Sequence, residues 1–124
     1  IYPSLDYTLN SASVEENAKG YLLQKEKIMW YLDNYFQKGE NRKAASPLYM
    51  DMTLGLPQTL VVTAQFCPLR DEGAAYAQKL ISAGLHAEHL HFDNIIHAFM
   101  NMEDLAKEQC QAVYRKIGAF LNMQ

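Results

Sequence analysis

The sequence is poor in cysteine, lacks a long apolar segment and has no excess of basic residues. Two cysteines in 124 residues argue against a disulfide-stabilised scaffold and favour a reducing, cytoplasmic location. No apolar run approaches the roughly 20 residues that a membrane-spanning helix needs, so no membrane partner is expected. Eleven basic residues against 14 acidic ones give a net charge of −3, and the scatter of the basic residues predicts no nucleic-acid surface.

The composition is that of a globular protein, with 49% hydrophobic and 20% charged residues. A chain of this length accommodates one domain, which we take to be residues 1–124. The chain begins with Ile1 rather than methionine, so we expect that its start was trimmed or that it belongs to something longer.

The first third of the chain predicts helices. Residues 13–16, Ser-Val-Glu-Glu, fit a capping box at a helix start, and Gly20 is expected to end that short helix. The polar segment 39–45 predicts a loop. Between these two segments, over about 23–36, apolar residues recur at helical spacing, namely Ile28, Leu32, Tyr35 and Phe36.

The second half of the chain predicts a strand, a helix, a second strand and a second helix. The first of these strands is apolar on both faces, which is typical of a buried parallel strand. Asp93-Asn94 is expected to turn the chain after the second strand, and Tyr2-Pro3 could be the tail of a strand whose beginning is missing. The four predicted segments are 59–65, 68–84, 85–92 and 103–121.

These patterns predict an α/β fold with two or three parallel strands and right-handed crossover helices. Residues of about 4–45 would form a helical region, and residues of about 46–124 the portion that contains the strands. A sheet this narrow leaves an open edge, which has to be paired or covered. We therefore expect either self-association or a complementary segment that completes the sheet.

Two residues stand where open α/β sheets gather their functional groups, beyond the carboxyl ends of the strands. Cys67 follows the first predicted strand and His97 the second, so their side chains could approach each other if the strands are neighbours. From the residues alone, Cys67 could be a nucleophile activated by His97, a metal ligand or a small buried residue. Cys110 falls on an apolar helical stripe and is interpreted as part of the core.

Three further histidines, His86, His89 and His91, lie on the second predicted strand. Alternation along a strand places His89 and His91 on one face, which could suit a metal ion. Zinc sites need three or four ligands, however, and no cysteine or carboxylate completes a recognisable set nearby. We interpret the pattern as an exposed strand face and expect neither a metal nor another cofactor.

Several motifs, in order along the chain, are those of one group of enzymes. They are Tyr2-Pro3, Gly20-Tyr21-Leu22-Leu23, Met29-Trp30, Tyr35, Ser46-Pro47-Leu48, Gly55-Leu56-Pro57, Pro68-Leu69-Arg70-Asp71-Glu72-Gly73, Ala75-Tyr76-Ala77, Ala83-Gly84 and Ile96-His97-Ala98-Phe99. With these motifs the chain resembles the α/β-hydrolase fold-3 group, the esterases and lipases related to hormone-sensitive lipase. The resemblance covers all 124 residues but only the C-terminal part of such an enzyme, less than half of it.

The resemblance implies a Ser-His-Asp triad in the chain order serine, acid, histidine. The histidine of that triad maps onto His97, which is followed by Ala98 where the group has glycine. Its aspartate maps onto Cys67, so the acid position is altered. Asp71 or Asp93 could replace the missing acid, provided that the fold brings one of them to the histidine.

The resemblance also implies a partial α/β-hydrolase fold in which residues of about 4–45 form cap-like helices. Met29 and Trp30, in the aromatic and methionine-rich part of this region, could bind substrate by lining an acyl pocket. A helical stripe that packs on the core would show the same pattern.

The serine and oxyanion-hole motifs of the group, G-x-S-x-G and an HGGG-type segment, do not occur in this chain. The resemblance therefore predicts the C-terminal segment of a carboxylic-ester hydrolase, inactive alone, which acts on a small ester only when an N-terminal hydrolase segment completes it. An alternative is a free-standing, non-catalytic and oligomeric remnant in which Cys67 marks a lost aspartate. A third possibility is a thiol or metal site formed by Cys67 and His97.

Overall fold

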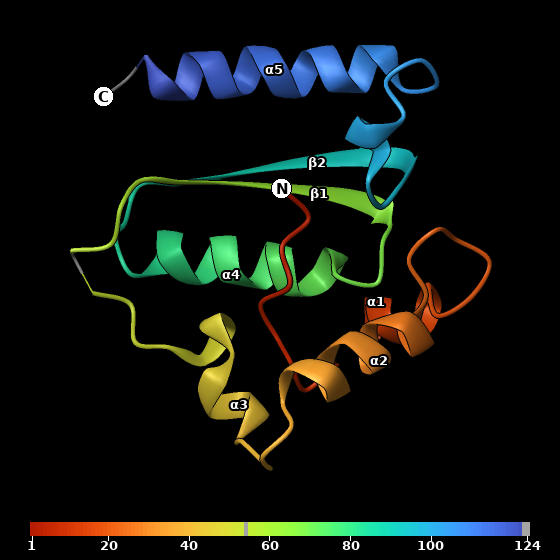
Figure 1. Ribbon diagram of the computed structural model, residues 1–124. Helices are drawn as coiled ribbons and strands as arrows, with labels where there is room; N and C mark the ends of the chain where they lie inside the picture. Colours follow the sequence, from red (N-terminus) through yellow and green to blue (C-terminus); the bar gives the residue numbers. More distant parts are fainter. Residues whose placement is uncertain (54, 123–124) are drawn as a thin grey trace.

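The described part of the chain, residues 1–53 and 55–122 of a computed structural model, contains a parallel sheet of two strands with helices against both faces. The crossover helix α4 covers one face, and the C-terminal helix α5 lies across the other (Figure 1). This arrangement confirms the predicted α/β class. The elements are α1 (Ala12–Glu16), α2 (Lys25–Tyr35), α3 (Arg42–Ala45), η1 (Pro47–Tyr49), β1 (Thr59–Phe66), α4 (Arg70–Ser82), β2 (Ala87–Ile96), η2 (Phe99–Asn101) and α5 (Lys107–Leu121).

Alternation along β1 divides its side chains between the two helices. Val62 belongs to the buried cluster that includes Cys110 and Val113 of α5. On the opposite face, a Cβ atom on Gly73 of α4 would come within 2.7 Å of the Thr63 side chain, so the helix packs closely because this residue is glycine. The strand is thus buried on both faces, which explains its continuous apolar run.

The N-terminal segment runs beside β1 before it enters the helical region. The N–H of Tyr2 donates to the carbonyl of Val62 at 2.7 Å, so the expected strand tail at Tyr2-Pro3 lies next to the sheet without forming a third strand in the described part of the chain. Further along, Glu72 of α4 accepts the N–H of Leu5 and holds this segment in place. The helices α2 and α3 lie beyond α4, on the side of the molecule away from α5 (Figure 1).

Three predictions for the first 45 residues are wrong. Helix α1 ends at Glu16, with Asn17 at its C-cap, rather than at Gly20. Ser13 does not cap α1: Ser11 stands at the N-cap, and the Ser13 hydroxyl donates to the carbonyl of Pro68 at 2.7 Å. The hydroxyl therefore serves a tertiary contact with the start of α4 rather than its own helix. The segment 39–45, predicted as a loop, contains the single turn α3, which begins after the capping side chain of Asn41.

The starts of the two long helices also differ from the prediction. Helix α4 begins at Arg70, so Pro68 precedes the helix instead of occupying its first turn. Helix α5 begins at Lys107, four residues after the expected start at 103. None of the helices within residues 1–53 and 55–122 is long and apolar enough to cross a membrane.

The turn predicted at Asp93-Asn94 lies inside β2, which continues to Ile96. The turn signal marks an irregularity in the strand: Asn94 has a positive φ of 56°, and the register of the sheet shifts at the level of Gln65. The side chain of Gln65 accepts the N–H of Asn94 at 2.6 Å and so replaces a regular ladder bond. The strand is longer than predicted because this side chain bridges the bulge.

Candidate active site

The ends of β1 and β2 bring Cys67 and His97 together. Because the strands are parallel and adjacent, the residues that follow them emerge at the same edge of the sheet, and the N–H of His97 donates to the carbonyl of Phe66 at 3.3 Å. The two side chains meet with 3.1 Å between Cys67 Sγ and His97 Nδ1. The fold therefore makes the contact that the sequence left conditional, while the catalytic roles of both residues stay predictions.

The thiol of Cys67 is fully buried, with an exposed fraction of 0%. Burial raises its pKa to about 12, because a thiolate would lose its hydration here, and the N–H of Leu69 at 3.4 Å from Sγ offsets only part of that rise. Cys67 is therefore a neutral thiol near pH 7. A buried and protonated thiol lacks the accessibility and the thiolate character of nucleophilic or metal-binding cysteines.

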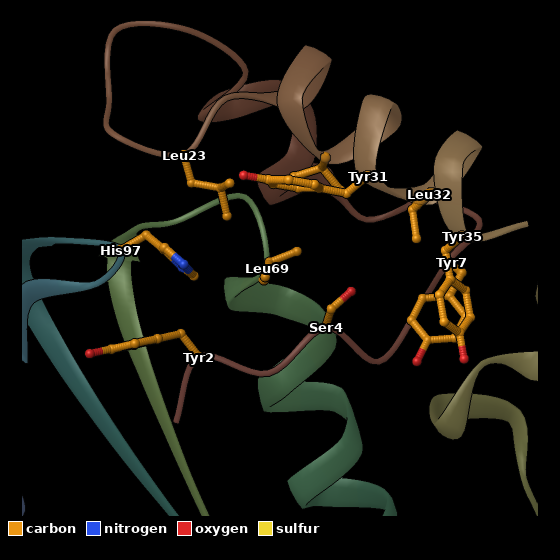
Figure 2. Close-up of a pocket in the computed structure, with 10 residues that line it drawn as sticks. Tyr2, Ser4, Tyr7, Leu23, Tyr31, Leu32, Tyr35, Leu69 and His97 are labelled. Carbon is orange, nitrogen blue, oxygen red and sulfur yellow. The ribbon is translucent and has the colours of Figure 1, made fainter.

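The imidazole of His97 is partly buried and packs against the ring of Tyr2, with 4.9 Å between the ring centroids. Burial lowers its pKa below the ordinary value of 6.5, so the ring is neutral at pH 7. Its Nδ1 atom contacts Cys67, and the ring projects between Tyr2 and Leu69 into a cavity (Figure 2). A neutral imidazole at the wall of a cavity has the protonation state that a general base requires.

The residue after His97 shows why glycine suits this position. Ala98 adopts φ 61° and ψ 25°, the left-handed region in which a Cβ atom costs about 1–2 kcal/mol. The turn redirects the chain from β2 into η2, so that His97 faces the cavity while the next side chain, Phe99, is buried in the core. Alanine preserves this turn at the expense of backbone strain.

The cavity beside His97 has a volume of about 490 Å³ and lies between the strand ends, the N-terminal segment and α2 (Figure 2). Its walls are mainly aliphatic and aromatic, which suits a small uncharged molecule better than an ion. The lining residues are Tyr2, Ser4, Tyr7, Leu23, Ile28, Tyr31, Leu32, Tyr35, Leu69 and His97.

Met29 and Trp30 do not line this cavity. Their exposed fractions are 43% and 56%, and the side of α2 that faces the cavity carries Ile28 and Tyr31 instead. The position of Met29 and Trp30 follows from the helical period, which turns neighbouring residues by about 100°. Contact of Met29 or Trp30 with a substrate stays a prediction, and it would need a wall that the described residues do not form.

Ser4 and Tyr7 line the cavity, although no pattern in the sequence marked them as residues of a site. Both come from an irregular segment before α1, so no periodicity marked them. Tyr2 was noticed as a possible strand end, but its place in the wall of the cavity depends on the hydrogen bond between its N–H and β1. Only the tertiary structure assembles these residues with His97.

The two candidate replacement acids are engaged elsewhere. Burial alone would raise the pKa of Asp71, but the Arg70 guanidinium at 2.8 Å and the N–H of Ser13 lower it below its ordinary value. Asp93 is exposed and lies 3.4 Å from the side chain of His91. Among the residues that the structure describes, neither carboxylate is hydrogen-bonded to His97.

His89 and His91 of β2 both contact the hydroxyl of Thr63 on β1. His89 Nε2 and His91 Nδ1 each lie 2.8 Å from the hydroxyl of Thr63, so the prediction that they share a face is confirmed. His86, which was predicted on the same strand, precedes β2, and its ring centroid lies 6.1 Å from that of Phe120. Within the described ranges, no group of three or more histidine, cysteine, aspartate or glutamate residues is placed to hold a metal ion.

Two adjacent parallel strands joined by a helical crossover, with Cys67 and His97 at their carboxyl ends beside a cavity, are consistent with a part of an α/β hydrolase. The family model described as "alpha/beta hydrolase fold" matches residues 1–101. The chain belongs to this family, in the group related to hormone-sensitive lipase that the sequence motifs indicate.

Curated relatives include ester hydrolases. The carboxylic ester hydrolase LipN of Mycobacterium tuberculosis is 33% identical over 108 residues, which are 85% of this chain and 29% of that protein. The ethyl acetate hydrolase of Pseudomonas putida is 30% identical over 121 residues, 96% of this chain and 38% of that protein. The chain therefore spans about a third of the length of these relatives.

Solved structures of esterases share the fold. An ester hydrolase from the metagenome of Lake Arreo matches 90% of this chain with a TM-score of 0.83 and 35% identity, over 36% of its own chain. The hyperthermophilic esterase from Pyrobaculum calidifontis matches 98% with a TM-score of 0.85 and 29% identity, over 41% of its own chain. In both comparisons the shared part is less than half of the solved structure.

Proposed function

We propose that this chain supplies the histidine, the acid position and part of the substrate-covering helices of a carboxylic-ester hydrolase. The observation that carries the proposal is the placement of His97, which contacts the acid-position residue Cys67 on one side and lines an apolar cavity on the other. The nucleophilic serine and the oxyanion hole would come from an N-terminal hydrolase segment outside these 124 residues. The ester-hydrolase names of the relatives support this assignment.

In the proposed reaction, His97 Nε2 accepts the proton of the serine hydroxyl as the oxygen attacks the ester carbonyl. The proton then passes from the imidazolium to the departing alcohol, which leaves an acyl-enzyme. Water repeats the sequence with His97 again as base, and this step releases the carboxylic acid. The mainly apolar walls of the cavity would hold a small, uncharged ester next to the ring.

The acid position limits this reaction. A triad aspartate orients the imidazole and stabilises the imidazolium as it forms, and loss of that carboxylate in a serine protease lowers kcat about 10⁴-fold. The neutral thiol of Cys67 provides no negative charge. We therefore propose a rate reduced by about that factor in the completed enzyme, and no hydrolysis by residues 1–124 alone.

The burial of Cys67 favours a second candidate, a non-catalytic remnant that self-associates. A neutral, fully buried thiol fills the acid position without serving the histidine as a carboxylate would. Large apolar side chains are also exposed, among them Leu105 at 86% and Tyr35 at 75%. A second copy could cover these residues and the open edges of the sheet.

The size of the natural product tests these candidates first. An antibody against α5 would report the mass of the protein in the cell that makes it. A band near 14.2 kDa supports the self-associating remnant, whereas a band more than twice that size supports the hydrolase. The protein of natural length is then assayed with a short-chain p-nitrophenyl ester beside its His97→Gln variant. Hydrolysis that the variant loses supports the proposed reaction, and equal rates from both proteins contradict it.

A further inference from the structure

We propose that Cys67 acts as a positioning residue that holds the neutral ring of His97 in the tautomer with its proton on Nε2. In this tautomer Nδ1 accepts a hydrogen bond from the thiol, and the nitrogen directed away from Cys67 is a donor instead of an acceptor. The inference concerns the imidazole itself. Only its consequence for ester hydrolysis rests on the proposed function.

The hydrogen-bond donors and acceptors around the Cys67 sulfur favour this tautomer. The sulfur of Cys67 lies 3.4 Å from the N–H of Leu69, which donates to it, and 3.1 Å from His97 Nδ1. Among the described residues, no other group lies within hydrogen-bond reach of Sγ. If Nδ1 carried the proton, the sulfur would accept two hydrogens and the buried S–H would have no acceptor. With the proton on Nε2, every hydrogen around the sulfur has a partner.

The surroundings of both groups keep them uncharged, so one shared hydrogen decides the tautomer. Burial raises the pKa of the Cys67 thiol and lowers the pKa of the His97 imidazole, which disfavours a thiolate–imidazolium pair. The charged side chains act on the thiol in opposite directions: Glu72 raises its pKa, and Arg70 lowers it by a smaller amount. The pair is therefore a neutral thiol that donates to a neutral imidazole.

An aspartate at this position would impose the opposite tautomer. An ionised carboxylate only accepts hydrogen bonds, so it requires a proton on Nδ1 and leaves Nε2 free to accept the hydroxyl proton of a serine. With Cys67, the proton must first move from Nε2 to Nδ1, and the S–H then loses its acceptor. The cysteine thus keeps His97 in place by contact, while it holds the ring in the tautomer whose Nε2 accepts no serine proton until the ring proton has moved to Nδ1.

Nitrogen NMR of the histidine rings tests this inference without any ester. The protein, labelled with ¹⁵N-histidine and purified at its natural length, is examined at pH 8, where His97 is neutral. Long-range proton–nitrogen correlations distinguish a protonated from an unprotonated ring nitrogen, and the His97→Gln variant assigns the signal by its loss. We expect a protonated Nε2 and an unprotonated Nδ1. A proton on Nδ1 overturns the inference.

The Cys67→Asp variant tests whether Cys67 is the cause. We expect the two nitrogen signals of His97 to exchange their character in this variant, and to stay unchanged in the control Cys110→Ser, whose buried thiol contacts the carbonyl of Phe99 instead. Retention of the Nε2 proton in folded Cys67→Asp overturns the positioning role. If that variant does not fold, the signal of the unmodified protein still decides the tautomer. Because the readout is spectroscopic, an absence of esterase activity would count against the proposed function alone.

Discussion

Glu72 Oε1 accepts the N–H of Leu5 at 2.5 Å, across 67 residues of sequence. The same oxygen accepts the N–H of Asp6 at 3.2 Å, while Oε2 is buried without a hydrogen-bond partner among the described residues. This one carboxylate therefore connects the start of α4 to the segment that carries Tyr2 and Ser4 into the cavity.

Burial raises the pKa of Glu72 to about 7 from an ordinary 4.5. The N–H groups of Leu5 and Asp6 offset part of this rise, and the Asp6 carboxylate adds a smaller contribution to it. The folded state therefore binds this proton more tightly than the unfolded state does. The resulting stabilisation is complete below pH 4.5 and is lost as the pH rises to about 7, by roughly 3 kcal/mol.

Substitution of Glu72 by glutamine should remove this decline, because the amide does not titrate. Urea denaturation at pH 5 and pH 8 measures the difference in free energy of unfolding. We expect the difference to shrink by up to about 3 kcal/mol in Glu72→Gln. The exposed Glu108→Gln variant serves as the control and should keep the decline. An unchanged pH dependence in Glu72→Gln would contradict the raised pKa.

Substitution of Cys67 by aspartate should increase ester hydrolysis by the enzyme of natural length. The carboxylate stabilises the imidazolium of His97, and we expect kcat/KM to rise by as much as about 10⁴-fold. The acid limb of the pH–rate profile follows the pKa of His97, which burial places below 6.5. In Cys67→Asp this limb should move to higher pH. An increase in rate without that movement would show that the carboxylate acts other than through His97.

Substitution of Ala98 by glycine should stabilise the protein. Ala98 occupies the left-handed region at φ 61°, and removal of its Cβ relieves strain of about 1–2 kcal/mol. Part of this gain is offset by the greater freedom of glycine in the unfolded chain. The control Ala75→Gly, on the exposed side of α4, should be destabilised by about 1 kcal/mol. Thermal or urea denaturation that destabilises both variants equally would contradict the strain.

Two glycine-to-alanine substitutions in helices should have opposite effects. At Gly73, a Cβ would come within 2.7 Å of the Thr63 side chain, and we expect a loss of about 1–3 kcal/mol as β1 and α4 separate. At Gly118 in α5, no described atom outside the adjoining helix backbone lies within 4 Å of the added Cβ, so alanine should gain roughly 0.5–1 kcal/mol through helix propensity. Stabilisation of Gly73→Ala in the same denaturation assay would show that α4 can move away at little cost.

The sequence was sufficient for those features that depend on neighbouring residues. The apolar run after Thr59 and the stripe at Cys110, Val113 and Phe120 predicted β1 and α5, because burial of a strand or of one helix face imposes a short period on the chain. The order of these elements predicted a parallel sheet. That sheet in turn made a contact between the residues that follow its two strands possible.

Predictions failed where a side chain serves a distant partner. Ser13 has the spacing of a helix cap but donates to Pro68, and the Asp93-Asn94 turn signal lies in a bulge of β2 that the side chain of Gln65 bridges. A local pattern indicates which hydrogen bonds a side chain can form with its sequence neighbours. It does not indicate which distant groups compete for the same side chain. The walls of the cavity were missed in part for a different reason: Tyr7 lies in an irregular segment, where no periodicity marks the residues that face inward.

Local patterns in the chain were enough to predict the α/β class and to mark Cys67 and His97 as the residues beyond the two strands. That Cys67 stands at the position of a triad aspartate is what the resemblance to the esterases implies. The tertiary structure decided that the thiol is buried and neutral, that Sγ lies 3.1 Å from Nδ1, and that the imidazole faces a cavity. The sequence gives the identity of each residue. The hydration of the Cys67 thiol and the hydrogen bond that it shares with His97 depend on the groups packed around them in the folded protein. The chemistry available to Cys67 and His97 is therefore a property of the folded protein.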